Sequence, residues 1–372
     1  IEHPQYTKAA AAFSGDSGFY SGAQSMKKAL DEANEKGTLK SETTILPGIS
    51  SVSALAAHFG VSWNDAVLAS IHGRRTNVVN LVRKNPKVFL LLSGKNDFEM
   101  LVNKFREARI NNVKISAGYR ISYPDEKLFT FYLDEFETKL FDLPEGVYTC
   151  LIENEDCEEQ ILTPGMDDEI FSRTKVPMTK NEVRVLSISR LELTKNAVVY
   201  DVGSGTGSVS AECARLSPDI FVFAIEQKEE AANLTKENAA GLLDQIVVIN
   251  KKAPEGFEEL PTPTHVFIGG SSGALSDILS AIQKKLIVKE NTKGKTDKIS
   301  KGVRVVINAV SLETIAQITK LIQTYPVAHV QLTQIQASRA HKLGSYNLMQ
   351  AQNPVLIASF DLLPDDKIEA NE

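Results

Sequence analysis

The chain has few cysteines, no long apolar run and no excess of positive charge. Its 372 residues include three cysteines, Cys150, Cys157 and Cys213, and no Cys-x-x-Cys pair. Three thiols cannot form an even disulfide framework, which favours a reducing compartment, the cytoplasm. No apolar run approaches the roughly 18 residues that a membrane-spanning helix needs, and no signal peptide is visible. The formal net charge of −6 argues against a nucleic-acid partner.

The remaining composition is that of an ordinary globular protein. Hydrophobic residues make up 42% and charged residues 24% of the chain, and 372 residues suit two domains, each with its own core. None of the six histidines falls in a ligand-spaced cluster with Cys or Asp, so we expect no metal site. The chain opens on Ile1 rather than methionine, so we expect a processed or truncated product.

The most informative stretch is an apolar run that stops abruptly in alternating glycines. Residues 198–208 read Val-Val-Tyr-Asp-Val-Gly-Ser-Gly-Thr-Gly-Ser. The pattern predicts a buried strand, a tight turn through Gly203, Gly205 and Gly207, and a helix from Ser208. Such a turn offers free backbone N–H groups at the carboxyl edge of a parallel sheet, where open α/β sheets bind ligands.

The spacing of this turn separates three nucleotide-type ligands. A dinucleotide fingerprint that starts at Gly203 needs glycine where Ser208 stands, and a P-loop needs a lysine that the turn lacks. What remains, Asp-x-Gly-x-Gly-x-Gly, resembles the S-adenosylmethionine (SAM) turn of class I methyltransferases, whose ligand carries a positive sulfonium. A second strand, 220–225, ends in Glu226, where a carboxylate accepts ribose hydroxyls. Asp201 has two open roles, cofactor contact or anchoring the turn N–H groups.

The rest of the second half alternates strands with helices. We expect strands over 246–249, 265–268 and 303–308, helices over 208–216, 229–242, 275–286 and 312–324, and a closing antiparallel pair over 328–337 and 354–360. This order predicts a doubly wound α/β sheet. Thr179 with Glu182 predicts a capping box for a helix that ends at Leu191. The lysine-rich tract 284–301 predicts a surface loop.

The first half also alternates strands and helices. We expect strands over 9–13, 43–46, 88–92 and 113–119, and helices over 25–35, 51–58 and 97–109. Ser50 and Ser51 are the predicted caps of the second helix. The acidic stretch 153–159, followed by Thr-Pro-Gly, predicts a solvated linker that divides the chain into domains 1–162 and 163–372.

The first half contains a series of distinctive motifs. They are Ser-Gly-Asp-Ser-Gly-Phe-Tyr-Ser-Gly-Ala (14–23), Leu-Pro-Gly-Ile-Ser-Ser-Val-Ser-Ala (46–54), Trp63-x-Asp65, Ser-Ile-His-Gly-Arg (70–74) and Tyr-Pro-Asp-Glu (123–126). Together they resemble the carbon-5 methyltransferases of cobalamin biosynthesis, in the tetrapyrrole methylase superfamily. The resemblance implies two small α/β lobes with SAM between them, and Gly15, Asp16, Pro47 and Gly48 as cofactor-binding residues.

This first half departs from the family pattern. Ser17 replaces the proline of the family's Gly-Asp-Pro, and the opening Gly-x-Gly-Pro-Gly loop is absent with most of the first lobe. A cleft needs both walls, and a parallel sheet that lacks its first strand exposes an edge. We therefore expect a partial domain without carbon-5 methylation activity.

A second set of motifs covers nearly all of the second half. They are Pro-Met-Thr-Lys-x-Glu-Val-Arg (177–184), Asp-Val-Gly-Ser-Gly-Thr-Gly-Ser-Val-Ser (201–210), Ala-Pro-Glu (253–255), Ile-Gly-Gly-Ser-Ser-Gly (268–273), Ser-Arg-Ala-x-Lys-Leu-Gly-Ser-Tyr (338–346) and Asn-Pro-Val (353–355). They resemble the decarboxylating carbon-15 methyltransferases, which act on precorrin-6B or its cobalt form. The order of the halves resembles the fused precorrin-6Y carbon-5,15-methyltransferases.

The resemblance implies a class I SAM-methyltransferase fold, methylation of a precorrin at carbon 15 and loss of carbon dioxide from the ring C acetate arm. The implied SAM-binding residues are Thr179, Asp201, Gly203, Ser204, Gly205, Thr206, Gly207, Glu226 and Ala253. No catalytic side chain is assigned, because the sulfonium is already activated and the macrocycle is an electron sink. Lys252 stands where the family commonly has Asp, which places cofactor affinity in question.

A precorrin carries many carboxylates, so cations are expected in its pocket. The candidates are Arg184, Arg339 and Lys342, each with a surface ion pair as its alternative role. Gly270 and Ser271 either let the macrocycle approach the backbone or form a plain tight turn. The resemblance further implies a homo-oligomer formed through the second domain, with a tetramer as one candidate assembly. Two other functions stay open: methylation of another small molecule, and non-catalytic docking of other pathway enzymes.

Overall fold

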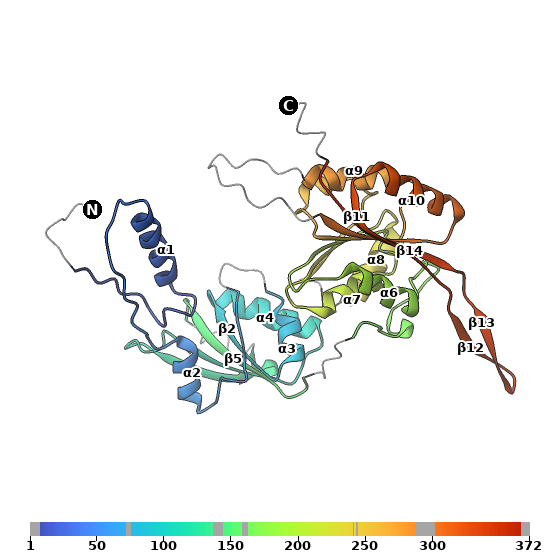
Figure 1. Cartoon of the computed structure of the whole chain (residues 1–372). Helices are drawn as coiled ribbons and strands as arrows, with labels where there is room; N and C mark the ends of the chain where they lie inside the picture. Colours follow the sequence, from blue (N-terminus) through green and yellow to red (C-terminus); the bar gives the residue numbers. More distant parts are fainter. Residues whose placement is uncertain are drawn as a thin grey trace. The chain divides into compact units, whose positions relative to one another are not determined.

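The computed structural model describes residues 8–71, 76–136, 144–157, 163–240, 242, 245–286 and 302–365 (Figure 1). The chain divides into two compact units between Glu158 and Glu159, and each unit is described by itself. The predicted boundary at 162 lies outside the described residues, as do His72, Gly73 and Arg74 of one motif and most of the lysine-rich tract.

The first unit is built on a mixed five-stranded sheet. Its helices are α1 (Gly22–Glu35), α2 (Ser51–Phe59), α3 (Val78–Lys84) and α4 (Lys95–Glu107), and its strands are β1 (Val67–Ser70), β2 (Lys87–Leu92), β3 (Val113–Tyr119), β4 (Lys127–Tyr132) and β5 (Tyr148–Asn154). The strand order is β1-β2-β5-β3-β4. Only β1 and β2 pair in parallel, so the parallel sheet expected for this half is wrong.

Helices cover both faces of this sheet. Phe98 and Phe105 of α4 pack with α3 and the strands in one core, whereas Leu55 of α2 packs against Phe89 and Leu151 on the opposite face. The predicted cap of α2 is confirmed, since the Ser50 hydroxyl accepts from the N–H of Ser53 at 3.0 Å. The strands predicted over 88–92 and 113–119 are confirmed as β2 and β3. Their apolar residues are buried on both faces of the sheet.

Three predictions for the first unit are wrong. No strand forms over 9–13 or 43–46, where the chain is mostly exposed and pairs with no other strand. Residues 9–12 are all alanine, which favours strands weakly. The predicted linker begins too early, because β5 continues to Asn154, whose side chain donates to the carbonyl oxygen of Val82 at 2.8 Å.

The second unit is a doubly wound sheet, as predicted. Its helices are α6 (Asn181–Leu191), α7 (Ser208–Leu216), α8 (Glu229–Asn238), α9 (Leu275–Leu286) and α10 (Leu312–Thr324); its strands are β6 (Val198–Val202), β7 (Phe221–Ile225), β8 (Ile246–Ile249), β9 (His265–Ile268), β10 (Val303–Ala309), β11 (Val327–Ile335), β12 (Ser338–Leu343), β13 (Tyr346–Ala351) and β14 (Val355–Leu362). Seven strands lie in the order β11-β14-β10-β9-β6-β7-β8. β14 runs antiparallel to both neighbours, and the others pair in parallel.

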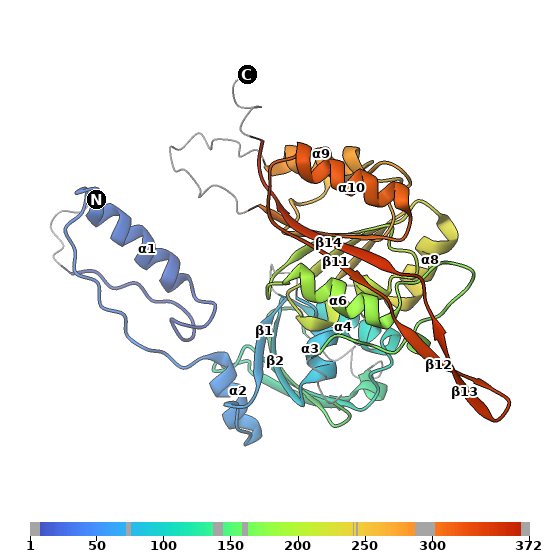
Figure 2. The ribbon, with the colours of Figure 1, turned by 45° about the vertical axis from the view of Figure 1, so that its right-hand side comes forward.

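An apolar core lies on each face of this sheet, and Figure 2 shows α9 and α10 on one side of the sheet and α6 on the other. Helices α9 and α10 bury Ile278, Ile282 and Ile318 on one face, and α6 and α7 bury Ile188 and Cys213 on the other. The sheet edge where β6, β7, β9 and β10 end therefore lies between the two helical layers, with short loops at that edge.

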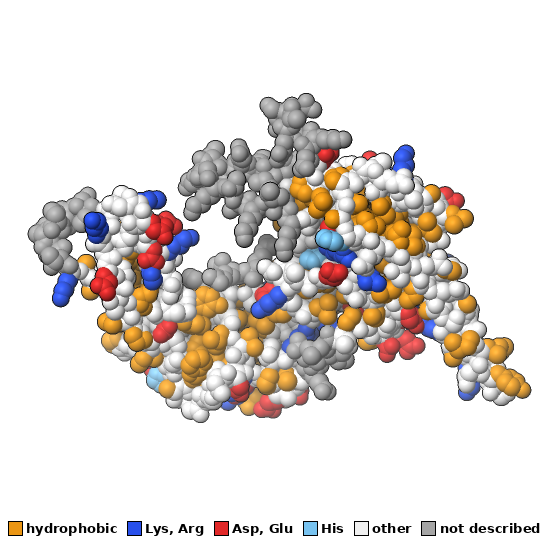
Figure 3. Space-filling view, viewed as in Figure 1, with side chains coloured by type: hydrophobic (Ala, Val, Ile, Leu, Met, Phe, Trp, Pro, Cys, Tyr) orange, Lys and Arg blue, Asp and Glu red, His pale blue; other side chains and the backbone are white. Residues whose placement is uncertain are grey.

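The sequence did not predict a separate hairpin, β12 with β13, that interrupts the closing strands. It forms its own two-stranded sheet and projects from the second unit (Figure 1). Hydrophobic side chains lie along it (Figure 3). Leu343, Tyr346, Leu348 and Met349 are all exposed.

The predicted capping box of α6 is wrong. The helix begins at Asn181, and its N-cap, Lys180, makes no side-chain capping bond. The carboxylate of Asp168 accepts from the N–H of Asn181 at 3.0 Å instead. Glu182 is engaged by Arg339, which donates to both of its oxygens at 2.7 and 2.6 Å.

Candidate cofactor and substrate cavity

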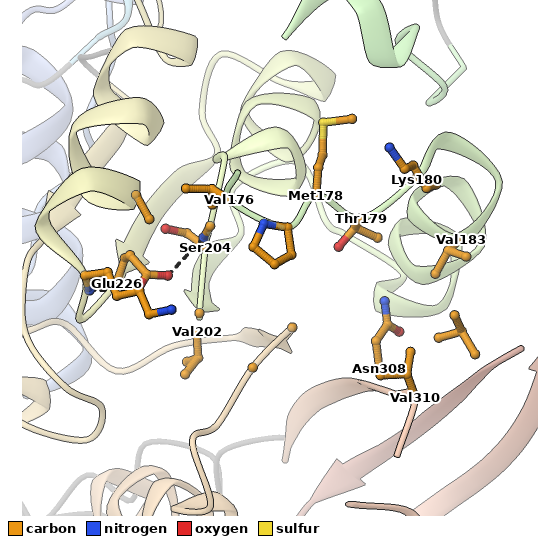
Figure 4. A pocket seen from close by; sticks show the side chains of 18 of the residues that line it. Val176, Met178, Thr179, Lys180, Val183, Val202, Ser204, Glu226, Asn308 and Val310 are labelled. Atoms are coloured by element: carbon orange, nitrogen blue, oxygen red, sulfur yellow. Dashed lines mark hydrogen bonds between the residues drawn. The ribbon is translucent and has the colours of Figure 1, made fainter. Parts of the chain in front are cut away.

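A cavity of about 1040 Å³ lies at the carboxyl ends of the second unit's parallel strands. Its lining includes these predicted site residues: Thr179, Gly203, Ser204, Gly205, Glu226, Ala253, Gly270, Ser271 and Arg339. In Figure 4, Ser204 and Glu226 lie on one side of the cavity, and Thr179 and Asn308 lie on the other. The structure thus brings together most of the residues proposed for cofactor and substrate, whose roles stay predictions.

The glycine turn lets the backbone of two other segments lie close to it. A Cβ atom on Gly203 would lie 2.5 Å from the carbonyl oxygen of Gly270, and one on Gly205 would lie 3.0 Å from that of Pro177. Both glycines have positive φ. Side chains at these positions would collide with neighbouring backbone, so the turn requires glycine for space as well as conformation.

The N–H groups of this turn are not free, in contrast to the prediction. Those of Gly203 and Ser204 donate to the carbonyl oxygen of Ile225 at 2.9 and 3.2 Å, and that of Gly207 donates to Ser204 at 2.8 Å. The N–H of Gly205 donates to Oε2 of Glu226 at 3.1 Å. A phosphate needs such donors, so their internal use agrees with a ligand that lacks a pyrophosphate.

Glu226 follows β7 and is held by backbone on two sides. Oε2 accepts from Gly205, and Oε1 accepts from the N–H of Lys228 at 2.9 Å. The side chain is largely buried yet lines the cavity. Each carboxylate oxygen has a second lone pair, so this geometry leaves acceptors for two ligand hydroxyls.

Three residues predicted to bind the cofactor do not line the cavity. They are Asp201, in β6, and Thr206 and Gly207, in the last part of the turn. Oδ2 of Asp201 accepts from the Ser210 hydroxyl at 2.5 Å, and its Oδ1 is buried with no hydrogen-bond partner. Burial raises the pKa of Asp201 to about 6. In this structure Asp201 bonds to Ser210 of α7 and is not part of the cavity lining, so its part in cofactor binding stays a prediction.

Arg184, a predicted substrate-binding cation, does not line the cavity either. It is 0% exposed and lies in a buried charge cluster, where it donates to Glu212 at 2.7 Å and to Asp168 at 3.0 Å. It also donates to the carbonyl oxygens of Thr179, at 2.7 Å, and of Met166. Arg184 therefore holds the segment 165–180 against α7 and makes no contact with the cavity.

The other two predicted substrate cations differ. Arg339 lines the cavity, but its guanidinium is already paired with the carboxylates of Glu182 and Asp168. Hydrogen bonds from Arg339 lower the pKa of Glu182. Burial alone would raise the pKa of Asp168, but hydrogen bonds from Arg339 and Arg184 hold it below its ordinary value. Lys342 lies on the exposed hairpin and is not part of the lining.

The structure brings together two of the first unit's predicted cofactor loops. A Cβ atom on Gly48 would lie 2.3 Å from the carbonyl oxygen of Gly15, so the loops that carry Asp16 and Pro47 touch through backbone. Oδ1 of Asp16 accepts from the N–H of Gly18 at 2.7 Å, which makes it a turn-forming residue here. Cofactor binding by these four residues stays a prediction.

Sequence reasoning missed several cavity residues. Asn308, near the end of β10, has a buried amide nitrogen without a partner among the described residues. Its place at a strand end was the available signal. His341, Gln350 and Asn353 line the cavity because the hairpin begins there, and no pattern predicted that hairpin. Among the described residues, no group of three or more His, Cys, Asp or Glu gathers as a metal site.

Comparison with known proteins adds to this geometry. The precorrin methyltransferase domain family matches residues 169–361, and the tetrapyrrole (corrin/porphyrin) methylase family matches residues 2–137. A probable cobalt-precorrin-6B C(15)-methyltransferase (decarboxylating) from Pyrobaculum calidifontis is 37% identical over 199 residues, which cover 52% of this chain and 94% of that protein.

A relative that spans both units is a precorrin-6Y C(5,15)-methyltransferase (decarboxylating) from Sinorhizobium sp. It is 28% identical over 324 residues, which cover 84% of this chain and 72% of the relative. A crystal structure of a precorrin-6Y C5,15-methyltransferase from Geobacter metallireducens GS-15 is 29% identical, covers 54% of this chain and 97% of its own, and superposes with a TM-score of 0.46. Among the described helices, none is long and apolar enough to cross a membrane.

Proposed function

Since the chain belongs to the precorrin methyltransferase family, we propose that its second unit transfers a methyl group from SAM to carbon 15 of a precorrin and removes carbon dioxide from the acetate arm of ring C. The substrate of this reaction is precorrin-6B or its cobalt form. We further propose that the reaction takes place in the cytoplasm, in keeping with three free thiols.

The observation that carries this proposal is the cavity at the ends of the parallel strands. Its volume of about 1040 Å³ lies at the upper end of the 300–1,000 Å³ or so that one small ligand occupies. Adenosine-type recognition by Glu226 and the glycine turn uses one side of it. The opposite side, bounded by Asn308, Val310 and the hairpin base, remains for the part of the macrocycle that receives the methyl group.

The residues present fit SAM. Glu226 would accept the ribose hydroxyls, the turn from Gly203 to Gly205, which lines the cavity, would pack against the nucleoside, and Thr179 and Ala253 would complete the contact. The cofactor brings a methyl group already activated on a positive sulfur. The chain's part is therefore to align the two ligands and to exclude water, which needs no nucleophilic side chain.

We assign the substrate carboxylates to lysines rather than to the two arginines. Lys175, Lys180, Lys228 and Lys252 line the cavity, and the described residues give none of them an ion-pair partner. Arg339, in contrast, already faces two carboxylates. Flexible ammonium groups bind carboxylates as point charges and adapt to a substrate that carries many of them.

We propose that the hairpin of β12 and β13 joins copies of this chain, with a tetramer as the expected assembly. Its tip exposes Leu343, Tyr346 and Met349, and exposed apolar patches of this kind mark association surfaces. Tyr346→Ser with Met349→Ser should shift the full chain to a smaller species in analytical ultracentrifugation. An unchanged sedimentation coefficient would rule the hairpin out as the contact.

Calorimetric titration with S-adenosylhomocysteine tests the cofactor assignment. Glu226→Gln should weaken binding by roughly 10- to 100-fold, because each hydrogen bond to a charged group is worth about 1.5–3 kcal/mol. Glu230→Gln, which changes another cavity carboxyl, is the matched control. Equal affinities for both variants would contradict the assignment. The number of S-adenosylhomocysteine molecules bound per chain also distinguishes one site from two. A second site would argue against the expectation that the first unit is inactive.

Turnover tests the substrate. The full chain, incubated with SAM and precorrin-6B, should yield a product that has gained a methyl group and lost carbon dioxide, both read by mass spectrometry. Methylation of an unrelated small molecule in place of precorrin-6B would favour the first alternative function. Cofactor binding with no turnover of any tetrapyrrole would favour the docking role.

A further inference from the structure

Loss of carbon dioxide creates a need for a proton. This inference rests on the proposed function. When the acetate arm –CH2–COO⁻ releases carbon dioxide, the electron pair of the broken C–C bond passes into the conjugated macrocycle. The methylene carbon must then gain a proton and become a methyl group. SAM supplies no proton for this step, so a side chain or water at the cavity must do so.

The cavity lining offers few groups that exchange protons near neutral pH. Among its described residues, it contains no cysteine, tyrosine or aspartate, and His341 is its only imidazole. An ammonium group releases its proton readily only well above neutral pH, whereas imidazole exchanges protons close to neutrality. Of the two carboxyl groups in this described lining, Glu226 is held at the cofactor end by the backbone of Gly205 and Lys228, and Glu230 lies four residues further on, in the first turn of α8.

The pairing of the hairpin shows where His341 points. Arg339 of β12 directs its side chain to the body of the unit, where it donates to Glu182 and to Asp168 at 2.8 Å. Side chains two residues apart on a strand share a face, so His341 lies on the same face as Arg339. Opposite them on β13 stand Gln350 and Leu348.

Arg339 therefore holds β12, the strand that carries His341, in place beside the cavity. Its guanidinium pairs with Glu182 on α6 and with Asp168, which is 5% exposed and also bound to Arg184. This anchor fixes the base of an otherwise exposed hairpin beside the cavity. The charged groups gathered at this anchor are one guanidinium and two carboxylates, and the lysines Lys175, Lys180, Lys228, Lys251 and Lys252 line the same cavity.

We propose that His341 donates the proton that replaces carbon dioxide on the acetate arm. The imidazolium N–H bond breaks as the new C–H bond forms, and the electron pair returns from the macrocycle to that carbon. Carbon dioxide leaves with the carboxyl carbon and both oxygens. The neutral imidazole is reprotonated by solvent, to which the exposed hairpin gives access. Arg339 is a positioning residue for this step.

The test compares His341→Ala with His329→Ala in the full chain. His329 lies on β11, is 78% exposed, hydrogen-bonds to Asp361 and is not part of the cavity lining. With SAM and precorrin-6B, His341→Ala should slow decarboxylation by roughly 10²- to 10⁴-fold, the usual contribution of a general acid. Its affinity for S-adenosylhomocysteine and its KM should remain those of the unmodified chain. Added imidazole should restore much of the rate.

The outcomes separate this role from the proposed function. Decarboxylation by His341→Ala at the rate of His329→Ala would overturn the role of His341. Loss of activity that imidazole does not restore, together with weaker cofactor binding, would show a structural role and also overturn it. Failure of the unmodified chain to convert precorrin-6B while it binds S-adenosylhomocysteine would overturn the proposed function itself.

Discussion

The buried charge cluster around Arg184 gives the sharpest test of how the second unit holds together. We consider Arg184→Met, which keeps a long side chain in the same space but removes the charge. In the native chain, the guanidinium donates to Glu212 at 2.7 Å, to Asp168 at 3.0 Å and to the backbone of Thr179 at 2.7 Å. It also lies over the ring of Phe171, 5.0 Å from its centroid.

The expected loss follows from what the substitution leaves behind. Glu212 is fully buried and would keep only the N–H groups of Gly165 and Met166 as partners, each at 2.8 Å. Asp168 would keep Arg339. Breaking a buried pair by removal of one partner costs about 3–5 kcal/mol, because an uncompensated charge remains. Methionine fills most of the volume, so the loss should come from the charge rather than from a cavity.

Two buried thiols allow each unit to be followed in the full chain. Cys213 lies in α7 of the second unit and Cys150 lies in β5 of the first, and both are fully buried. Pulsed thiol labelling in increasing urea, read by mass spectrometry at each site, gives a free energy of opening for each unit. We expect Arg184→Met to lower the value at Cys213 by about 3–5 kcal/mol and to leave Cys150 unchanged.

Two variants control this experiment. Arg184→Met with Glu212→Gln removes both charges and should recover part of the loss, about 1–3 kcal/mol. Lys195→Met removes a surface pair with Asp219, at 3.5 Å, and should change stability by less than about 1 kcal/mol. A single Arg184→Met variant as stable as Lys195→Met would refute the reasoning.

Three further predictions concern the cavity and its surroundings. Gly203→Ala should destabilise the second unit in urea by about 2 kcal/mol or more, since its Cβ atom would meet Gly270 backbone, whereas Gly270→Ala, whose Cβ atom meets nothing within 4 Å, should be nearly neutral. Asp201 has a folded pKa of about 6, above its unfolded value, so it contributes stability at low pH that is lost as pH rises through 6. Asp201→Asn should therefore be more stable than the unmodified chain by up to about 3 kcal/mol near pH 8. In urea unfolding, that advantage should vanish near pH 4. Lys252→Asp should bind S-adenosylhomocysteine more tightly in calorimetry, and an affinity equal to that of the unmodified chain would show that position 252 does not reach the adenine.

The fold of the second unit could be predicted because its signals are local. The run Val198 to Val202 is apolar except for Asp201 and is buried over most of its length, and the glycines that follow mark the end of the strand. The predicted bounds of α7 and α10 agree with the structure residue for residue. The β12–β13 hairpin was missed because its strands are exposed and because polar and apolar residues do not alternate along them.

The positions of the site's backbone were predictable, but the roles of its charged residues were not. A motif shows that Arg184 and Asp201 are present at particular places in the chain. It does not show that Glu212, 28 positions from Arg184, meets it in the interior. Likewise, the glycine pattern predicts free N–H groups in the turn. In the structure, the carboxylate of Glu226 and the carbonyl oxygen of Ile225, at the end of β7, accept from three of them. Partners that come from distant segments decide such roles.

The distribution of arginine and lysine in this cavity follows the geometry of the two side chains. Arg184 and Arg339 each meet two carboxylates at fixed distances, an arrangement that a planar guanidinium satisfies and an ammonium does not. These pairs set the positions of the 165–180 segment and of the hairpin, and they leave little positive charge for a ligand. Lysines on flexible stems, such as Lys180 and Lys252, keep their charge for the cavity. A substrate with many carboxylates is then attracted without bidentate contacts, which favours release of the product once it has lost one of those carboxylates.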